Sequence, residues 1–251
     1  MKDFTCNRLE ILLKTLVAKG YHPVTFRQFL ETEVSHEKQV IIRHDIDRNP
    51  GNALTIALKE QSIGIRASFY FRYPYTFDPQ IIRSIAVMGH EIGYHYEVLA
   101  KTRGNVNEAL LLFNSELDEF RKICEVVTCC AHGSPLSRFD NRDLFSGTNI
   151  SEFGILGDAH LSTPPGIPYF SDTGRSWGMQ DNLRDRLSSS PQITSIRSTD
   201  ELQEHLHTSN YSSLYLVIHP ERWNDPGIQW YLQLFRDTTF NLGKRLLRRV
   251  R

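Results

Sequence analysis

Apolar residues follow two patterns along the chain, and each pattern predicts a different kind of element. Short apolar or alternating stretches predict strands at about 39–45, 65–71, 90–95, 126–131, 152–157, 167–171 and 214–218. Stretches with apolar residues three and four apart predict helices at about 5–19, 50–63, 79–88, 106–120, 200–206 and after 226. Strands that alternate with helices in this way favour parallel β-α-β units.

Several predicted helices begin at recognisable capping residues. Asn49-Pro50, Asp78-Pro79 and Asp225-Pro226 each place a capping side chain before a proline at the first helical position. Thr25 and Asn105 are further candidate caps, and the first of them would open a short helix. These signals fix where the helices are expected to start.

Length and composition are those of an ordinary soluble domain. The chain of 251 residues is expected to form a single domain over 1–251, and its formal charge of zero gives no electrostatic case for nucleic acid. No apolar run approaches the ~20 residues that cross a bilayer, and the first residues lack a signal core, so the cytoplasm is the expected location. The basic residues of 244–251 favour a solvated helix end over contact with a membrane. Four cysteines without a CxxC pair are expected to be free, buried thiols.

The first candidate chemistry follows the strand that contains Val40-Ile41-Ile42. This strand runs into Asp45 and Asp47, which share one face of an extended chain because they lie two residues apart. One carboxylate can bind a cation while the other takes a proton from water. A surface turn with capping residues is the alternative, and the apolar run before the pair argues against it.

A second cluster spans residues 89–97. Glu91, His95 and Glu97 would share one strand face, and His95 suits a metal such as zinc through its neutral imidazole. His90 lies on the opposite face, so a structural role with satisfied hydrogen bonds is expected for it.

Three later clusters also follow predicted strands. His132 can be a metal ligand, a substrate donor or a partner of a loop carbonyl, and the sequence leaves these open. Asp172 and Arg175 with Trp177 could position a carboxylate base or stack a sugar, and a weak surface ion pair is the alternative. His219 is placed to act as a general acid.

The position of these clusters favours a barrel over an open sheet. Each cluster comes directly after a strand, and in a (β/α) barrel all such positions meet at one mouth. An open sheet would gather ligands at a single crevice instead.

The clusters, in this order, resemble the polysaccharide deacetylase family, also called carbohydrate esterase family four, over residues 39–223. The run Gly89-His90-Glu91-Ile92-Gly93-Tyr94-His95 is the most specific match. The resemblance implies a distorted (β/α) barrel of seven strands that removes acetyl groups from amino sugars with a divalent metal, commonly Zn²⁺.

The resemblance also implies roles for individual residues. Arg175 would orient Asp45, and His219 would protonate the leaving amine. The expected site comprises catalytic Asp45, His219 and Arg175; metal ligands Asp47, His95 and His132; and substrate-binding Glu97, Asp172 and Trp177.

One position departs from the family pattern. The family's second histidine ligand falls on Leu99, which cannot bind metal. The third ligand would then be Glu97 or His132, and His132 is preferred.

Three functions follow as hypotheses. The first is a hydrolase that removes an N-acetyl group from an amino sugar or nucleotide sugar, as a step toward surface polysaccharide. The second is a metal-dependent hydrolase of another small amide. The third is a sugar-binding barrel without metal, which Leu99 favours and the paired Asp45 and His219 oppose, since a binder needs neither acid nor base.

Overall fold

The computed structural model describes residues 2–32, 37–178, 185, 187 and 196–250, with side chains described as far as Gly243. Eight parallel strands form one sheet: β1 (His22–Val24), β2 (Gln39–Ile46), β3 (Ser68–Phe71), β4 (Glu91–Tyr96), β5 (Thr128–Ala131), β6 (Gly157–Asp158), β7 (Tyr169–Ser171) and β8 (Ser213–Ile218).

The sheet follows a curved path of seven strands in the order β6-β5-β4-β3-β2-β8-β7, and β1 pairs with the first part of β2. Within the described residues, β6 and β7 at the two ends of this path each pair with one neighbour, so the hydrogen-bonded wall does not close between them. The predicted distorted (β/α) barrel of seven strands is therefore confirmed, as a barrel with one open seam.

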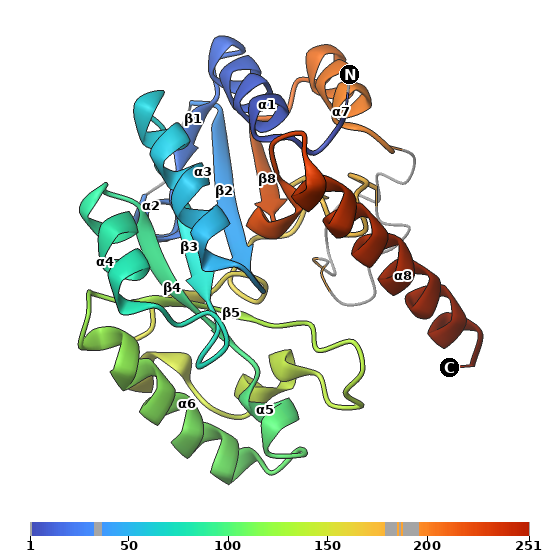
Figure 1. Ribbon diagram of the computed structural model, residues 1–251. Helices are drawn as coiled ribbons and strands as arrows, with labels where there is room; N and C mark the ends of the chain where they lie inside the picture. The colour runs from blue at the N-terminus through green and yellow to red at the C-terminus, as the bar shows by residue number, and fades with distance from the viewer. Residues whose placement is uncertain (1, 33–36, 179–184, 186, 188–195, 251) are drawn as a thin grey trace.

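The helices are α1 (Cys6–Ala18), α2 (Phe26–Glu31), α3 (Pro50–Ser62), α4 (Pro79–Val87), α5 (Val98–Lys101), α6 (Val106–Arg121), α7 (Thr199–Thr208) and α8 (Ile228–Val250). Short 3-10 helices occupy Asn141–Phe145, Ile150–Phe153 and Pro220–Arg222. Figure 1 shows α3 and α4 over the outer face of the sheet and α8 leading away from it toward the C-terminus.

Alternating side chains of β2 enter two different cores, which explains its continuous apolar run. Val40 and Ile42 pack outward with the covering helices, whereas Ile41 joins an inner cluster enclosed by the sheet. Because the side-chain period of a strand is two, Arg43 and Asp45 lie on the inner side with Ile41. The strand thus delivers a charged pair to the barrel interior just below its mouth.

Most capping predictions are confirmed. The side chains of Thr25, Asp78 and Asn105 accept hydrogen bonds from the first turns of α2, α4 and α6. Asn49 does precede α3, but its side chain makes no capping bond, because its backbone is left-handed (φ 50°) and its amide donates to Asn52. The predicted start of the last helix at Asp225-Pro226 is wrong, since α8 begins at Ile228.

Other boundaries differ from the prediction as well. The strand expected at 152–157 is wrong, because the 3-10 helix ends at Phe153 and only Gly157 and Asp158 join the sheet. Neither β1 nor α5 is predicted, and each is only three or four residues long. The cysteines are free, and three of the four are buried. Within the described residues, no helix combines the length and apolarity that crossing a bilayer requires.

Candidate active site

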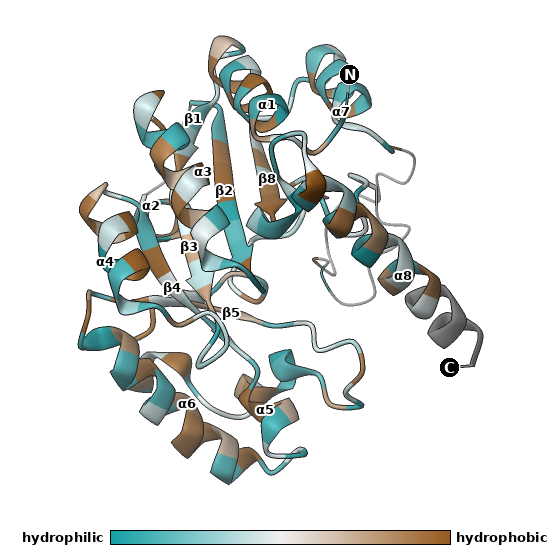
Figure 2. Cartoon of the chain, in the orientation of Figure 1, coloured by the Kyte–Doolittle hydropathy of each residue, from teal (hydrophilic) through white to brown (hydrophobic). Residues whose placement is uncertain are grey.

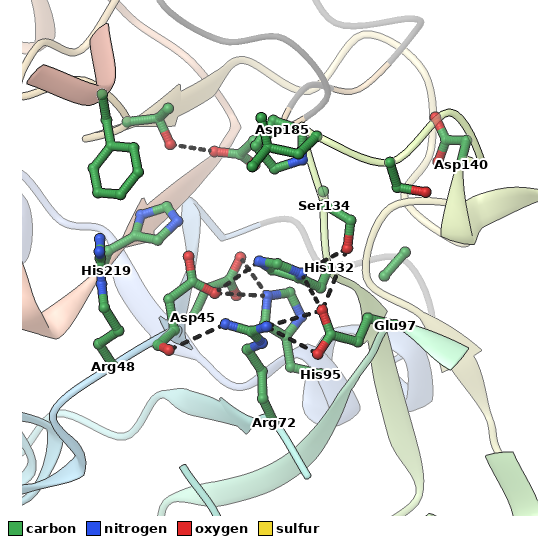
Figure 3. Close-up of a pocket in the computed structure, with 18 of the residues that line it drawn as sticks. Asp45, Arg48, Arg72, His95, Glu97, His132, Ser134, Asp140, Asp185 and His219 are labelled. Carbon is green, nitrogen blue, oxygen red and sulfur yellow. Dashed lines mark hydrogen bonds and ion pairs between the residues drawn. The ribbon is translucent and has the colours of Figure 1, made fainter. Parts of the chain in front are cut away.

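A cavity of about 450 Å³ opens at the carboxyl ends of the strands. Figure 3 shows its polar lining, with side chains from several strand ends pointing toward one another. The lining includes Asp45, Asp47, His95, Glu97, His132 and His219, so residues up to 174 positions apart in sequence meet here. The predicted convergence of the clusters at one mouth is confirmed for these six.

Three of these residues bring ligand atoms to a common point. Asp47 Oδ1 lies 3.5 Å from His95 Nε2 and 3.4 Å from His132 Nε2. The three ligand atoms all lie within 4.8 Å of one another, a spacing at which one ion can reach them. Asp47 follows β2, His95 is near the end of β4 and His132 follows β5 directly.

Both imidazoles are oriented by a bond at the opposite nitrogen. His95 Nδ1 is 2.9 Å from the Cys130 carbonyl oxygen, and His132 Nδ1 is 2.9 Å from Glu97 Oε2. Each Nδ1 therefore carries the donated proton, so that each ring, when neutral, turns its Nε2 lone pair toward Asp47. Asp47 Oδ1 is buried and makes no hydrogen bond within the described part of the chain. Two lone pairs facing a buried carboxylate oxygen fit a divalent cation such as Zn²⁺.

The electrostatics of the three groups agree with cation binding. Burial raises the pKa of Asp47, but His132 and His95 outweigh it and hold that pKa well below the ordinary value. Burial lowers the pKa of His132, which favours the neutral form that ligates metal. Burial also lowers the pKa of His95, but Asp45 and Asp47 raise it overall, so this site attracts positive charge.

Glu97 supports the ligands without being among the three. Its carboxylate accepts bonds of 2.9 and 2.8 Å from Arg72 Nη2 as well as the bond from His132. Burial raises the pKa of Glu97, but His132 and Arg72 lower it to about 2, so the group stays ionised. Leu99 lies in α5, buried in the outer core, and does not line the cavity. His132 therefore completes the group of three that could hold a metal, and its contact with Glu97 fixes its orientation.

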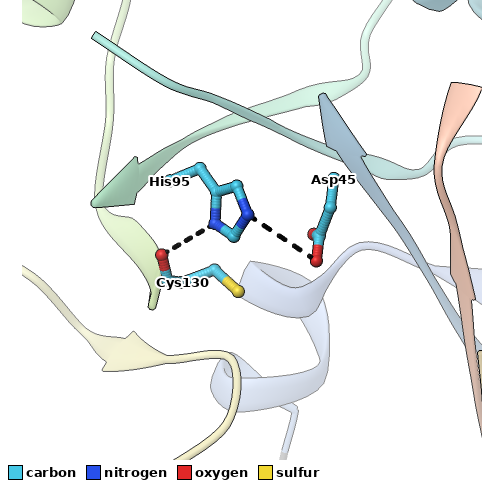
Figure 4. Close-up of side chains that lie close together, drawn as sticks. All are labelled: Asp45, His95 and Cys130. Carbon is cyan, nitrogen blue, oxygen red and sulfur yellow. Dashed lines mark hydrogen bonds and ion pairs between the residues drawn. The ribbon is translucent and has the colours of Figure 1, made fainter. Parts of the chain in front are cut away.

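A second group of potential ligands lies deeper and is a poorer cation site. Asp45, His95 and Cys130 approach one another in Figure 4, with His95 Nε2 3.9 Å from Asp45 Oδ2. Burial raises the pKa of the Cys130 thiol well above its ordinary value, so the sulfur is protonated. Asp45 is moreover already paired with Arg43.

The partner of Asp45 is not the one expected. Arg43 Nε lies 2.9 Å from Asp45 Oδ1, and Arg43 Nη2 donates to Asp45 Oδ2 at 3.0 Å. The expectation that Arg175 orients Asp45 is wrong. Arg175 lies outside the cavity, 3.7 Å from Asp237, with its guanidinium over the ring of Phe4.

His219 is held by a buried carboxylate. Its Nδ1 lies 2.6 Å from Asp172 Oδ1, and its backbone nitrogen donates to Asp172 Oδ2 at 2.9 Å. Arg222 and Trp223 donate to the same carboxylate at 2.9 and 2.7 Å. Burial and Arg222 lower the pKa of His219, but Asp172 raises it overall to about 9. His219 therefore presents a protonated ring to the cavity at neutral pH.

Two residues expected to bind substrate do not reach the cavity. Asp172 is fully buried beneath His219, so it orients that histidine and cannot touch a ligand. Trp177 is 1% exposed, donates from Nε1 to Thr199 and packs beside Trp223. The expectation of substrate contact is wrong for both residues, because each side chain belongs to the core.

Other site residues are missing from the sequence prediction. Three of them, Arg72, His160 and Asp185, line the cavity. The fourth, Arg43, donates a hydrogen bond to Asp45, which also lines it. Arg43 carries a usable signal, because it precedes Asp45 by two residues on a strand buried on both faces. Asp185, which accepts bonds from Thr173 and Arg43, lies in a stretch without periodicity and has no such signal. His90, by contrast, is structural as predicted, with Nδ1 accepting from Ala67 and Nε2 bonded to Ala57.

Comparisons with known proteins give similarities of shape at low sequence identity. No family model matches the chain, and no curated protein matches it either. A Streptococcus mutans CE4 esterase structure is similar with a TM-score of 0.47 and 15% identity, covering 90% of this chain and 86% of that one. A polysaccharide deacetylase from Bacillus cereus is similar with a TM-score of 0.42 and 14% identity, covering 81% and 88%.

A third similar structure is a mutant of a CE4 family pseudoenzyme with restored enzymatic activity. Its TM-score is 0.44 and its identity 12%, over 89% of this chain and 67% of that one. At these levels of similarity the roles of individual residues rest on the geometry of this chain.

Proposed function

We propose that this protein is a metal-dependent hydrolase that removes the N-acetyl group from an amino sugar or sugar precursor, as a step toward surface polysaccharide. The observation that carries the proposal is the convergence of Asp47, His95 and His132 on one point of a cavity that also holds Asp45 and His219. A pure binding protein would need neither the fixed carboxylate nor the protonated histidine beside that point.

Asp47, His95 and His132 would hold the cation through Oδ1 and the two Nε2 atoms. A divalent ion such as Zn²⁺ supplies Lewis acidity toward the acetamide carbonyl and lowers the pKa of water toward about 7. Asp47 is ionised and His132 favours its neutral form, so both are in the state that ligation requires. Glu97 and the Cys130 carbonyl keep the two rings turned correctly.

Asp45 is the proposed general base. Its carboxylate is buried beside the ligand cluster, with Oδ2 3.9 Å from His95 Nε2. The ion pair with Arg43 keeps Asp45 in one orientation while it takes a proton from the attacking water. Arg43 is itself fully buried and held by Tyr169 and Asp185, so it has little freedom to move away.

His219 is the proposed general acid. Its pKa of about 9 keeps a proton on the ring at neutral pH, and its Nδ1 is occupied by Asp172. The Nε2 proton is then the one available to the leaving amine of the sugar. The base thus lies on β2 and the acid directly follows β8, and these two strands pair along their length.

The cavity, at about 450 Å³, lies toward the lower end of the size range of small-ligand pockets. Its polar rim, with Arg48, Arg142 and Asn241, suits hydroxyl and phosphate oxygens of a carbohydrate or nucleotide sugar.

The test combines metal analysis with acetate release. The purified protein should contain one Zn²⁺ per chain and release acetate from at least one member of a panel of N-acetylated sugars and nucleotide sugars. Asp45→Asn, which is close in size, should keep the metal and lose acetate release. Metal without acetate release on any sugar, but turnover of another small amide, would favour the second function instead.

A further inference from the structure

The buried side chains on the inner face of helix α8 are polar, Gln233 and Asp237, and they lie beside the half-buried Trp230 and Leu234. Asp237 is buried and lies 3.7 Å from both Arg175 and Arg222. One turn later, the Asn241 amide donates to the Gly174 carbonyl oxygen at 2.9 Å. A surface helix of a globular protein normally turns its apolar stripe inward, and α8 does not.

The outward face of α8 is the apolar one. Ile228 and Phe235 are each 74% exposed, and three further residues of the same stripe are more than half exposed. The stripe comprises Ile228, Tyr231, Leu232, Phe235 and Leu242. At 100° per residue these positions fall within an arc of about 100°, so they form one continuous face. Figure 2 shows hydrophobic residues along α8 as far as its grey end.

The charge of the C-terminal residues indicates which partner the apolar face of α8 can bind. The sequence from 236 to 251 contains six basic residues and one acidic residue, Asp237. Asp237 is buried, so the part of α8 with described side chains, Ile228–Gly243, exposes no carboxylate. An apolar face on a helix with a strong excess of cations suits the interface of an anionic bilayer.

A second copy of the chain fits this face less well. Paired helices use opposite charges beside their apolar seam to choose partner and orientation. Two copies of α8 would bring cations to the seam without an exposed carboxylate to meet them in the described part of the helix. The sequence alone favours a solvated helix end for 244–251. The structure changes this interpretation, because α8 buries polar residues and exposes its apolar stripe.

We propose that α8 is a membrane-docking helix, which lies along the surface of an anionic lipid bilayer with Ile228, Phe235 and Leu242 inserted. Phe240 and Asn241 of the same helix line the cavity, so docking would hold the cavity mouth next to the lipid surface. The proposal concerns the exposed face of α8 and does not depend on the proposed deacetylase activity.

The test is co-sedimentation of the full chain with vesicles. Phosphatidylcholine vesicles that contain phosphatidylglycerol should bind the protein, phosphatidylcholine alone should bind it weakly, and added salt should release it. The double variant Phe235→Ser, Leu242→Ser should lower the partition coefficient at least roughly tenfold, since each change removes a large inserted side chain. Unchanged circular dichroism and melting would show that the variant is folded.

The matched control is Val87→Ser, Leu111→Ser, which removes two exposed apolar side chains from other helices. This control should bind vesicles like the wild type. Equal loss in both double variants, or no binding to anionic vesicles at low salt, would overturn the proposal. So would a dimer in sedimentation equilibrium that the α8 variant dissociates while vesicles bind neither protein, because the second copy would then be the occupant.

Discussion

Arg43 and Asp45 form a two-point ion pair inside the barrel, with Nε to Oδ1 at 2.9 Å and Nη2 to Oδ2 at 3.0 Å. The two residues lie two apart on β2, so the pleat of a single strand places both side chains inward. The proposed base and its positioning residue are thus built into one element. Loops elsewhere in the chain need not be arranged for the pair to form.

Removing Arg43 is expected to damage both stability and rate. In Arg43→Met, Asp45 and Asp185 would lose a buried cationic partner, which costs about 3–5 kcal/mol of unfolding free energy. The freed carboxylate would also lose its fixed orientation, and acetate release should fall roughly 100-fold in kcat. Denaturant titration and steady-state kinetics measure the two effects.

Arg175→Met is the matched control for that variant. It removes a buried arginine that pairs with Asp237 and lies outside the cavity, so kcat should stay within about threefold of wild type even if stability falls. A loss of kcat equal to that of Arg43→Met would contradict the assignment of Arg43 to Asp45.

Variants of Asp47 and Asp45 are expected to have different effects, the first on metal binding and the second on proton transfer. Asp47→Asn removes the charge of the atom nearest both imidazole nitrogens, so zinc content after dialysis should fall to a small fraction and activity with it. Asp45→Asn should retain zinc and lose about 100- to 10,000-fold in rate. Metal analysis beside acetate release distinguishes the pair, and zinc retained in Asp47→Asn would refute its role as ligand.

The strand-end clusters could be predicted because local pattern determines them. On β2 a period of two fixes which side chains face inward, and a polar residue after a buried apolar run marks the barrel mouth. His95, His132 and His219 follow this rule, and the structure brings all three to one cavity.

The errors arise where long-range packing decides the outcome. Arg175 and Trp177 follow β7 like true site residues, but the first lies between α8 and Phe4 and the second packs against Trp223. Nothing local in the sequence shows that the chain turns away from the mouth after Thr173. Asp185 is the reverse case, since it reaches Arg43 from a stretch with no periodic pattern.

A histidine at position 99 is not expected to replace His132 as the third metal ligand. His132→Ala should weaken zinc binding by more than about 100-fold, because it removes a ligand and leaves Glu97 without one of its partners. Adding Leu99→His should not restore it. Leu99 is buried in the outer core, so the new imidazole would cost about 1–3 kcal/mol of stability without reaching Asp47. Zinc titration with a competing chelator checks both variants, and restored affinity in the double variant would contradict the assignment.

The pH dependence of activity is expected to depend on Asp172. A general acid must be protonated, so wild-type kcat should fall at alkaline pH, where His219 loses its proton. In Asp172→Asn, burial and Arg222 still lower the pKa of His219 while the carboxylate that raises it most is gone, so the falling limb should move to lower pH. A merely structural role for Asp172 would lower activity equally at every pH.

The unfolding free energy of the metal-free protein should also depend on the protonation of His219. Because the folded pKa of His219, about 9, exceeds its ordinary value of 6.5, folding favours the protonated ring. This contribution, roughly 3 kcal/mol by the size of the shift, is fully present below pH 6.5 and is lost as pH rises through about 9. In His219→Gln the ring is absent, so the unfolding free energy should lose that slope between the two pH values. Chemical denaturation at several pH values measures the slope, and an identical slope in both proteins would show that Asp172 does not hold a proton on His219.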